Sequence, residues 1–391
     1  MKPIITLSLS TLFTLNAMAT EASTFSEVFS NADFSAELRL LYSNIDEKNT
    51  QDSYATAIGG ELKYELATFN GFGGGIALNT TNDIDTLTGD GQKYNSNLST
   101  KDGSYSELTQ AYLEYSSKNF SLRAGRQTLD TPLADSDDIR MVPNRFEAIV
   151  ASYNVEDLTF IFADVLRWNG VDAGLEKGWS KTGEDGTYTF AFLYEKETLN
   201  LSAWYYDVTK IASAYYLEAS ETLPLKAIEF TLGIQYLNQK EENNSGIKAS
   251  IYGLVAEAYS KGITLSLAYN SSARQKGKTS FSGFGGGTLF SSMDTMILDE
   301  ITQNAQAKAY LASLSYEINN FNLFYTYGDF RTKENKQVAK KHIVEQNIGI
   351  EYIPNDALTL STIFIKDTNK EDSKTAEFNA NNIRFLATYS F

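Results

Sequence analysis

The sequence has no cysteine, only five prolines and a single histidine, His342. Without cysteine the fold contains no disulfide bond, no thiolate nucleophile and no cysteine-based zinc site. One histidine is too few for a metal site with several histidine ligands, although it is enough for the base of a hydrolase triad. We therefore expect no cofactor and no transition-metal centre.

Long hydrophobic runs are also missing. After the first twenty residues, no stretch approaches the roughly 18 consecutive apolar residues that a transmembrane helix needs. Basic residues are few as well, 33 against 49 acidic, which gives a formal net charge of −16. This balance argues against nucleic acid as a partner and favours a surface that attracts cations.

The N-terminus has the pattern of a secretory signal peptide. Lys2 precedes the apolar run Ile4–Leu15, and Ala17-Met18-Ala19 follows as a small-residue cleavage signal. We expect residues 1–19 to be removed on export, leaving residues 20–391 as a single domain.

Aromatic residues are abundant, with 24 Tyr and 23 Phe spread along the chain and often at alternate positions. Such alternation is typical of strands with one apolar and one polar face. We expect eighteen strands, near residues 34–45, 58–66, 72–79, 105–115, 120–128, 146–155, 158–167, 187–195, 199–206, 212–219, 226–238, 247–259, 263–271, 306–318, 321–329, 343–353, 358–367 and 381–391.

Connection lengths alternate between short turns and long polar loops, as in bacterial outer-membrane barrels with their turns in the periplasm. The polar strand face carries charges such as Glu61 and Lys63, which suits a water-filled lumen. Only a closed sheet satisfies every backbone group in hydrocarbon. The sequence therefore predicts an all-β transmembrane antiparallel barrel of about eighteen strands in the outer membrane of a Gram-negative bacterium.

The chain ends in the sequence NNIRFLATYSF, in which Ile383, Phe385, Tyr389 and Phe391 share one face. We expect this face to meet lipid on the strand that closes the barrel. A C-terminal aromatic strand also resembles the signal by which the barrel-assembly machinery recognises outer-membrane proteins.

The stretch RAGRQTLDTPLADSDDIRMVPNRFEA, residues 123–148, is the most distinctive. It resembles the corresponding region of OprD-type outer-membrane porins, particularly those of epsilonproteobacterial type. The resemblance implies an eighteen-stranded channel for small solutes that is commonly trimeric. It also implies that the loop at residues 129–145 folds inward to narrow the pore, and that wall arginines guide carboxylates.

The charges that we expect at the pore lie on strands of inward parity and on this loop. Opposed acidic and basic side chains across a narrow aqueous gap create a transverse field. Further charges of nominal inward parity are Glu37, Lys63, Lys248, Lys308 and Arg384. The candidate pore and constriction residues are Arg39, Arg123, Gln127, Asp130, Asp135, Asp137, Asp138, Arg140 and Arg145.

Two other interpretations of this loop stay open. It could be a solvated external loop that the aspartates keep soluble, or residues 135–138 could bind Ca²⁺ through clustered carboxylates. Because acidic residues outnumber basic ones, we expect weak cation preference rather than the anion preference that the resemblance implies.

The function predicted is passive diffusion of small hydrophilic solutes and ions, without catalysis. A surface adhesin or structural barrel is the alternative, since long loops serve either purpose. A barrel hydrolase with His342 as its base is a third. The glycine-rich segment Ser282–Phe290 lacks the following Lys-Ser/Thr of a phosphate-binding loop, so we expect it to be a flexible external loop.

Overall fold

The computed structural model describes residues 21–84, 95–334, 336, 338–372 and 377–391. The predicted signal peptide, residues 1–19, lies outside the described residues. Helix is confined there to α1 (Phe25–Ser30), η1 (Leu175–Lys177) and η2 (Leu298–Ile301). None of these described helices is long and apolar enough to cross a membrane.

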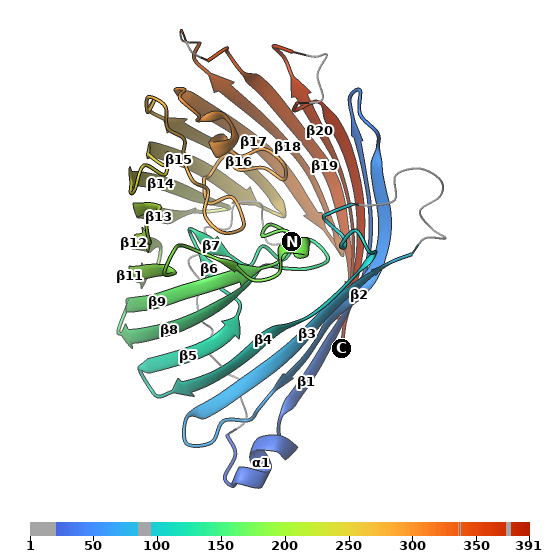
Figure 1. Ribbon diagram of the computed structural model, residues 1–391, viewed down its shortest axis with the longest axis vertical. Coiled ribbons are helices and arrows are strands. Elements are labelled where there is room, and N and C mark those ends of the chain that lie inside the picture. Colours follow the sequence, from blue (N-terminus) through green and yellow to red (C-terminus); the bar gives the residue numbers. More distant parts are fainter. Residues whose placement is uncertain (1–20, 85–94, 335, 337, 373–376) are drawn as a thin grey trace.

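One antiparallel sheet of 19 strands makes up almost the whole molecule (Figure 1). It closes because β1 pairs with both β2 and β21. Apart from the two-residue β10 (Ser180–Lys181), its members form the predicted 18-stranded barrel. The barrel strands are β1 (Asp33–Glu47), β2 (Ser53–Glu65), β3 (Phe72–Asp83), β4 (Ser104–Ser116), β5 (Phe120–Gln127), β8 (Arg145–Val155), β9 (Leu158–Asn169), β11 (Thr187–Lys196), β12 (Leu199–Val208), β13 (Ala212–Leu225), β14 (Ile228–Glu241), β15 (Ala249–Ser260), β16 (Ile263–Ser272), β17 (Ala307–Ile318), β18 (Phe321–Thr332), β19 (His342–Asn355), β20 (Leu358–Asn369) and β21 (Ala380–Ser390).

The C-terminus completes the closure. Phe391 exchanges two backbone hydrogen bonds with Ala36 on β1, of 2.9 and 2.8 Å. Its ring is 67% exposed, and Tyr389 and Ile383 on the same face are exposed too. The predicted aromatic stripe is therefore on the outer wall, where hydrocarbon replaces water as the solvent of the closing strand.

Tight turns join the strands at the end of the barrel where α1 and Phe391 lie. Two-residue connections occur at β8–β9, β11–β12, β13–β14, β15–β16 and β17–β18. Their first residues have positive φ, for example 52° at Glu156 and 52° at Asn319. Left-handed turns of this kind match the twist of paired strands, which explains why such short connections suffice.

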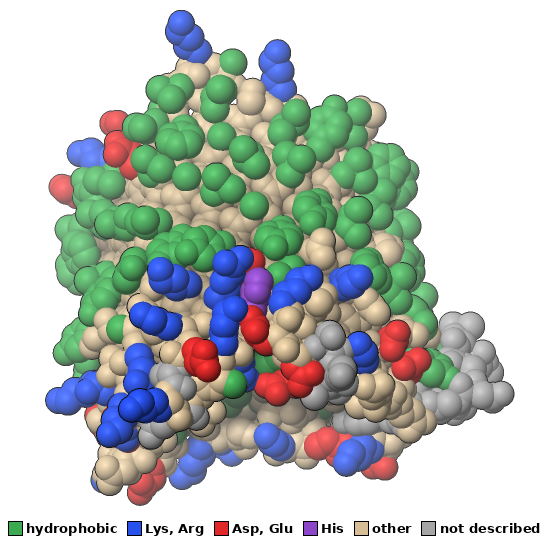
Figure 2. Space-filling model, turned by 90° about the horizontal axis from the view of Figure 1, so that it is seen from above, with side chains coloured by type: hydrophobic (Ala, Val, Ile, Leu, Met, Phe, Trp, Pro, Cys, Tyr) green, Lys and Arg blue, Asp and Glu red, His purple; other side chains and the backbone are tan. Residues whose placement is uncertain are grey.

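The outer wall is apolar. Leu113, Ile234 and Ile348 are more than half exposed. On the face that Figure 2 shows, hydrophobic side chains form a nearly continuous band. Charged side chains gather below that band in the same view, toward the long loops. This division is the one expected for a barrel crossing a bilayer.

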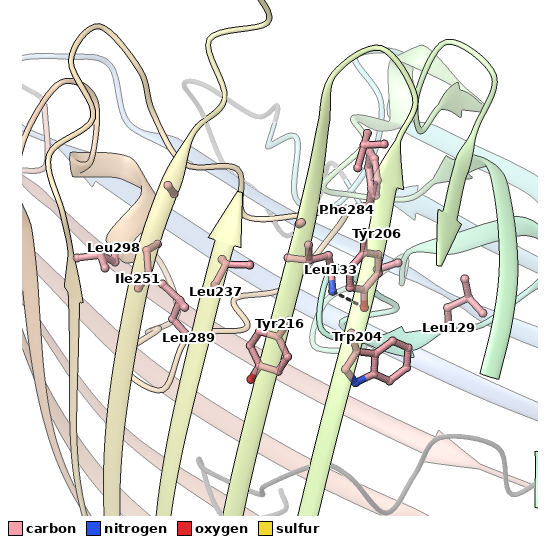
Figure 3. Packing of buried hydrophobic residues seen from close by; sticks show 14 of the residues in the cluster. Leu129, Leu133, Trp204, Tyr206, Tyr216, Leu237, Ile251, Phe284, Leu289 and Leu298 are labelled. Carbon is pink, nitrogen blue, oxygen red and sulfur yellow. Dashed lines mark hydrogen bonds between the residues drawn. The ribbon is translucent and has the colours of Figure 1, made fainter. Parts of the chain in front are cut away.

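On one side the interior is filled by apolar packing rather than by water (Figure 3). Inward residues of four neighbouring strands, β12 to β15, form this wall, and two long loops, at residues 128–144 and 273–306, pack against it. Leu133 donates its backbone N–H to the Tyr206 hydroxyl across 3.4 Å. The labelled members of the cluster are Leu129, Leu133, Trp204, Tyr206, Tyr216, Leu237, Ile251, Phe284, Leu289 and Leu298.

The expectation that Ser282–Phe290 is a flexible external loop is wrong. Phe284 exchanges backbone hydrogen bonds with Leu133 and Asp135, and Leu289 and Phe290 are buried. Gly283 has a φ of 96°, and a Cβ there would stand 2.7 Å from the Leu133 carbonyl oxygen. The glycines therefore permit close backbone packing inside the barrel.

Candidate pore constriction

Loop 128–144 carries its own small hairpin, β6 (Asp130–Thr131) and β7 (Ala134–Asp135), which lies inside the curve of the sheet (Figure 1). The Thr131 hydroxyl donates to the Ala134 carbonyl, and Ser136 bonds both backbone groups of Leu129. Leu129 and Leu133 anchor this hairpin to the apolar wall. The interpretation as a freely solvated external loop is therefore wrong for its buried part.

Arg39 connects this loop to β1. Its side chain is 6% exposed and pairs with Asp138, with 2.6 Å between Nη1 and Oδ1. It also donates to Glu37 and to the Arg140 carbonyl. A guanidinium held by three acceptors fixes the position of residues 138–140 over the β1 wall.

Arg145 makes a second connection, from the start of β8 to β2, with three strands (β5, β4 and β3) between them in the sheet. Its Nη2 lies 2.9 Å from the Glu61 carboxylate, and its Nη1 donates to the Asn144 carbonyl across 3.1 Å. Gln110 on β4 donates to the other Glu61 oxygen at 3.1 Å. The two sequence candidates Arg39 and Arg145 thus flank one polar region.

Paired charges continue along the same wall. Arg123 binds Glu114 across 2.6 Å and lies 4.2 Å from the centre of the Tyr112 ring. The Tyr112 hydroxyl donates to Glu65 at 2.6 Å, and Lys63 pairs with the same carboxylate at 2.8 Å. Each basic residue of this wall therefore has an acidic partner.

A pocket of about 480 Å³ opens between this wall and the loop. The charged side chains around it differ in exposure. Asp138 is 52% exposed and Glu37 28%, whereas Arg39 and Arg145 are each only 6% exposed. The charged residues that line it are Glu37, Arg39, Glu61, Lys63, Asp138 and Arg145.

Two loop carboxyl groups lie behind this pocket. Burial raises the pKa of Asp135 to about 6 and that of Asp137 to about 7, although Arg140 opposes the shift at Asp137. Arg140 pairs with Asp172 at 2.8 Å. Asp130 is exposed on β6.

A model of the outer membrane porin family OprD matches residues 28–391. The chain belongs to the OprD family of outer membrane porins. It is therefore a channel protein of the Gram-negative outer membrane and not an enzyme.

Solved structures share the porin's fold. Acinetobacter baumannii OccAB4 is 16% identical, with a TM-score of 0.79 over 92% of this chain and 98% of that one. Pseudomonas aeruginosa OpdQ is 16% identical, with a TM-score of 0.77 over 94% and 99%. A BenF-like porin from Pseudomonas fluorescens Pf-5 is 15% identical, with a TM-score of 0.79 over 93% and 99%. No curated protein matches the sequence.

Two residues expected in the porin's lumen are elsewhere. Gln127 is fully buried and donates to the Ala148 carbonyl at 3.0 Å, so it joins β5 to β8 instead of meeting water. Lys308 shares its strand face with the exposed Tyr310 and Leu314, so it lies on the outer wall. Lys308 was assigned to the lumen because it is charged, although the alternation along its strand places it on the outer face.

The porin also holds an anchor that sequence reasoning missed. Glu345 on β19 is fully buried and accepts backbone N–H groups of Asp294, Thr295 and Met296, at 3.1, 3.3 and 2.6 Å. Arg384 on β21 pairs with Asp294 from the neighbouring wall. The available signal was the inward parity of Glu345 on β19 and Arg384 on β21, two strands separated only by β20.

Neither metal binding nor hydrolysis gains support from the porin's geometry. Within the described residues, no group of three or more His, Cys, Asp or Glu side chains is placed to hold a metal ion. Asp138 of the proposed calcium cluster forms an ion pair with Arg39. His342 lies 3.2 Å from Asp329, a carboxylate that Arg331 also binds.

Proposed function

We propose that this porin lets small hydrophilic solutes and ions diffuse passively between the β1–β5 wall and loop 128–144, with a weak preference for cations. The observation that carries this proposal is the exposure of the pocket charges. Asp138 and Glu37 meet water, whereas Arg39 and Arg145 are nearly covered. A permeating ion therefore passes carboxylates at closer range than guanidinium groups.

The electrostatic reason is distance and screening. Arg39 is paired with both Glu37 and Asp138, so these three side chains carry a net negative charge, and the two carboxylates are their more exposed members. Exposed carboxylates in a narrow polar pocket raise the local concentration of cations. The constriction residues proposed for this path are Arg39, Asp138, Arg140 and Arg145, with Arg123 further along the wall and Asp130, Asp135 and Asp137 on the loop.

The test is the reversal potential of the purified porin in planar bilayers across a KCl gradient. We expect the unmodified channel to favour K⁺, and Asp138→Asn to move the K⁺/Cl⁻ permeability ratio toward 1. Asp356→Asn, which removes the same charge from the β19–β20 turn, is the control and leaves the ratio unchanged. A preference of the unmodified channel for Cl⁻ would overturn the proposal.

The apolar packing of Figure 3 keeps a second function open, because loops that fill one side of the interior are compatible with a surface adhesin or structural barrel. Conductance separates the two. Ion-permeable steps in bilayers support the porin function, whereas silence of correctly folded protein supports the alternative. We also propose a homotrimer, on the family resemblance alone, which the mass of the detergent-solubilised protein tests.

A further inference from the structure

Basic side chains gather on the outer wall where the apolar band ends, on the side of the long loops (Figure 2). Lys308 on β17, Arg331 on β18 and His342 on β19 are cross-strand neighbours. Lys366 on β20 is exposed and lies opposite Gln346, on the same outer face as Phe364. We call Lys308, Arg331, His342 and Lys366 the basic row.

The basic row is unusual in a chain with a net charge of −16. Asp329, the acidic residue that faces it, is 5% exposed and lies beneath Arg331 and His342. Above it, Lys341 pairs with Glu377, and Lys340 with Glu371. Arg331 stays 53% exposed despite its partner. The row therefore presents positive charge outward.

Tyrosines mark the depth of this row in the membrane. Tyr310 follows Lys308 on β17 and Tyr327 precedes Arg331 on β18, and both rings are exposed on the outer face. The ring centroids of Tyr269 and Tyr310 are 5.0 Å apart, so the two side chains are in contact across neighbouring strands. Tyrosine girdles lie at the headgroup level of a bilayer. The basic row lies closer than these tyrosines to the long loops, which places it at the level of the lipid phosphates.

An apolar groove of about 690 Å³ begins directly below those tyrosines. It is hollow because Ala256 and Ala312 alternate with the larger Leu267 and Tyr327 along one row of cross-strand neighbours. Its remaining outer side chains are exposed leucine and isoleucine. The volume and the apolar lining of the groove suit an acyl chain.

We propose that the basic row and this groove together bind a phosphate-bearing lipid of the outer leaflet. Arg331, Lys308 and Lys366 bind the phosphate oxygens through charge-assisted hydrogen bonds, and one acyl chain lies in the groove. Charge complementarity and the adjoining apolar groove select a lipid over a free anion or a polar protein surface.

The experiment measures binding of diphosphoryl lipid A to the full-length porin in detergent, by native mass spectrometry or fluorescence. We expect the triple variant Lys308→Gln, Arg331→Gln, Lys366→Gln to bind about tenfold more weakly or worse. The matched control, Lys118→Gln, Lys226→Gln, Lys261→Gln, removes three charges from the opposite end and binds as the unmodified porin does. Strand content by circular dichroism verifies that each variant is folded.

Two further arms identify the occupant. Ala256→Leu, Ala312→Leu fills the groove, and we expect it to weaken binding of lipid A while leaving the charges intact. Inorganic phosphate should compete poorly, and lipid A stripped of its phosphates should bind weakly to every variant. Equal binding by the triple variant and the unmodified porin would overturn the proposal, as would an equal loss in the control. Conductance tests the proposed pore separately.

Discussion

At the scale of single residues, the proposed constriction is a set of arginines that each pair with a carboxylate on another element. Arg39 and Arg145 tie loop and strand ends to β1 and β2, with distances of 2.6 and 2.9 Å to Asp138 and Glu61. Guanidinium groups suit this pairing because their planar N–H donors match carboxylate oxygens. The side chains of their acidic partners, Asp138 and Glu61, are more exposed to solvent than the arginines.

Two partly buried loop carboxyl groups should make the proposed cation preference dependent on pH. Burial raises the pKa of Asp135 to about 6 and of Asp137 to about 7, so raising the pH from 5 to 8 ionises both and adds negative charge. We expect the K⁺/Cl⁻ permeability ratio to rise over this window, and to rise much less in Asp135→Asn, Asp137→Asn.

Bilayer reversal potentials at stepped pH measure this profile, with Asp130→Asn as the exposed control on the same hairpin. An unchanged rise in the double variant would contradict the assignment. Because the folded-state pKa values are raised, any contribution to stability is complete below the ordinary aspartate pKa, roughly 4, and is lost as the pH rises through about 6 to 7.

At the scale of elements, loop 273–306 is held in place by two kinds of contact, apolar packing in one part and hydrogen bonds to a carboxylate in the other. Apolar packing of Phe284 and Leu289 fixes one part of loop 273–306 to the β12–β15 wall. The other part is fixed by Glu345, whose carboxylate accepts three consecutive backbone N–H groups. Released from Glu345, the second part would lose its position while the first stayed packed.

Glu345→Ala should therefore widen the channel. Hydrogen bonds to a charged group contribute about 1.5–3 kcal/mol each, so the loss is enough to free residues 293–296 locally. We expect larger single-channel conductance and faster amide exchange in this segment. Glu229→Ala, which removes an exposed carboxylate at the other end of the barrel, should change neither. Equal conductance of Glu345→Ala and the unmodified porin would refute the anchoring role.

At the scale of the whole molecule, closure depends on the pairing of β21 with β1, which the Phe391 backbone extends. Phe391 pairs with Ala36, and its ring and that of Tyr389 extend the lipid-facing stripe. Without the final strand, β1 and β20 would expose unpaired backbone groups to hydrocarbon. The end of the sequence is therefore where the barrel is sealed.

We expect Phe391→Ser to lower the yield of protease-resistant barrel in the outer membrane, because it removes the terminal aromatic ring proposed to be recognised during assembly. The folded fraction, measured by the gel shift between unheated and heated samples, should fall severalfold. Phe25→Ser, at an aromatic ring of α1 that is 69% exposed, is the control. A normal yield for Phe391→Ser would rule out that role.

The alternation of apolar and polar residues located the strands closely. The first strand was expected at 34–45 and is β1, Asp33–Glu47, and the last was expected at 381–391 and is β21, Ala380–Ser390. Such agreement follows from local physics, because each strand must present one face to lipid regardless of its partners. The alternation itself places Lys308 with Tyr310 and Leu314, and only its polarity, which marks the membrane edge here, pointed to the lumen.

The sequence contains no comparable periodic pattern that would predict the contacts of the long loops. Phe284 meets Leu133 across about 150 residues of sequence, and Glu345 meets Thr295 from a different part of the chain. Glycines in the segment Ser282–Phe290 indicate flexibility locally but allow tight packing in the fold.

The sequence by itself determined a sealed barrel with lipid outside, since hydrocarbon acts on every strand in the same way. Only the tertiary structure decided that one side of the interior is packed and that the pore charges lie against β1 and β2. Those contacts join side chains that are far apart in the sequence, and the alternation of apolar and polar residues within one strand does not specify them.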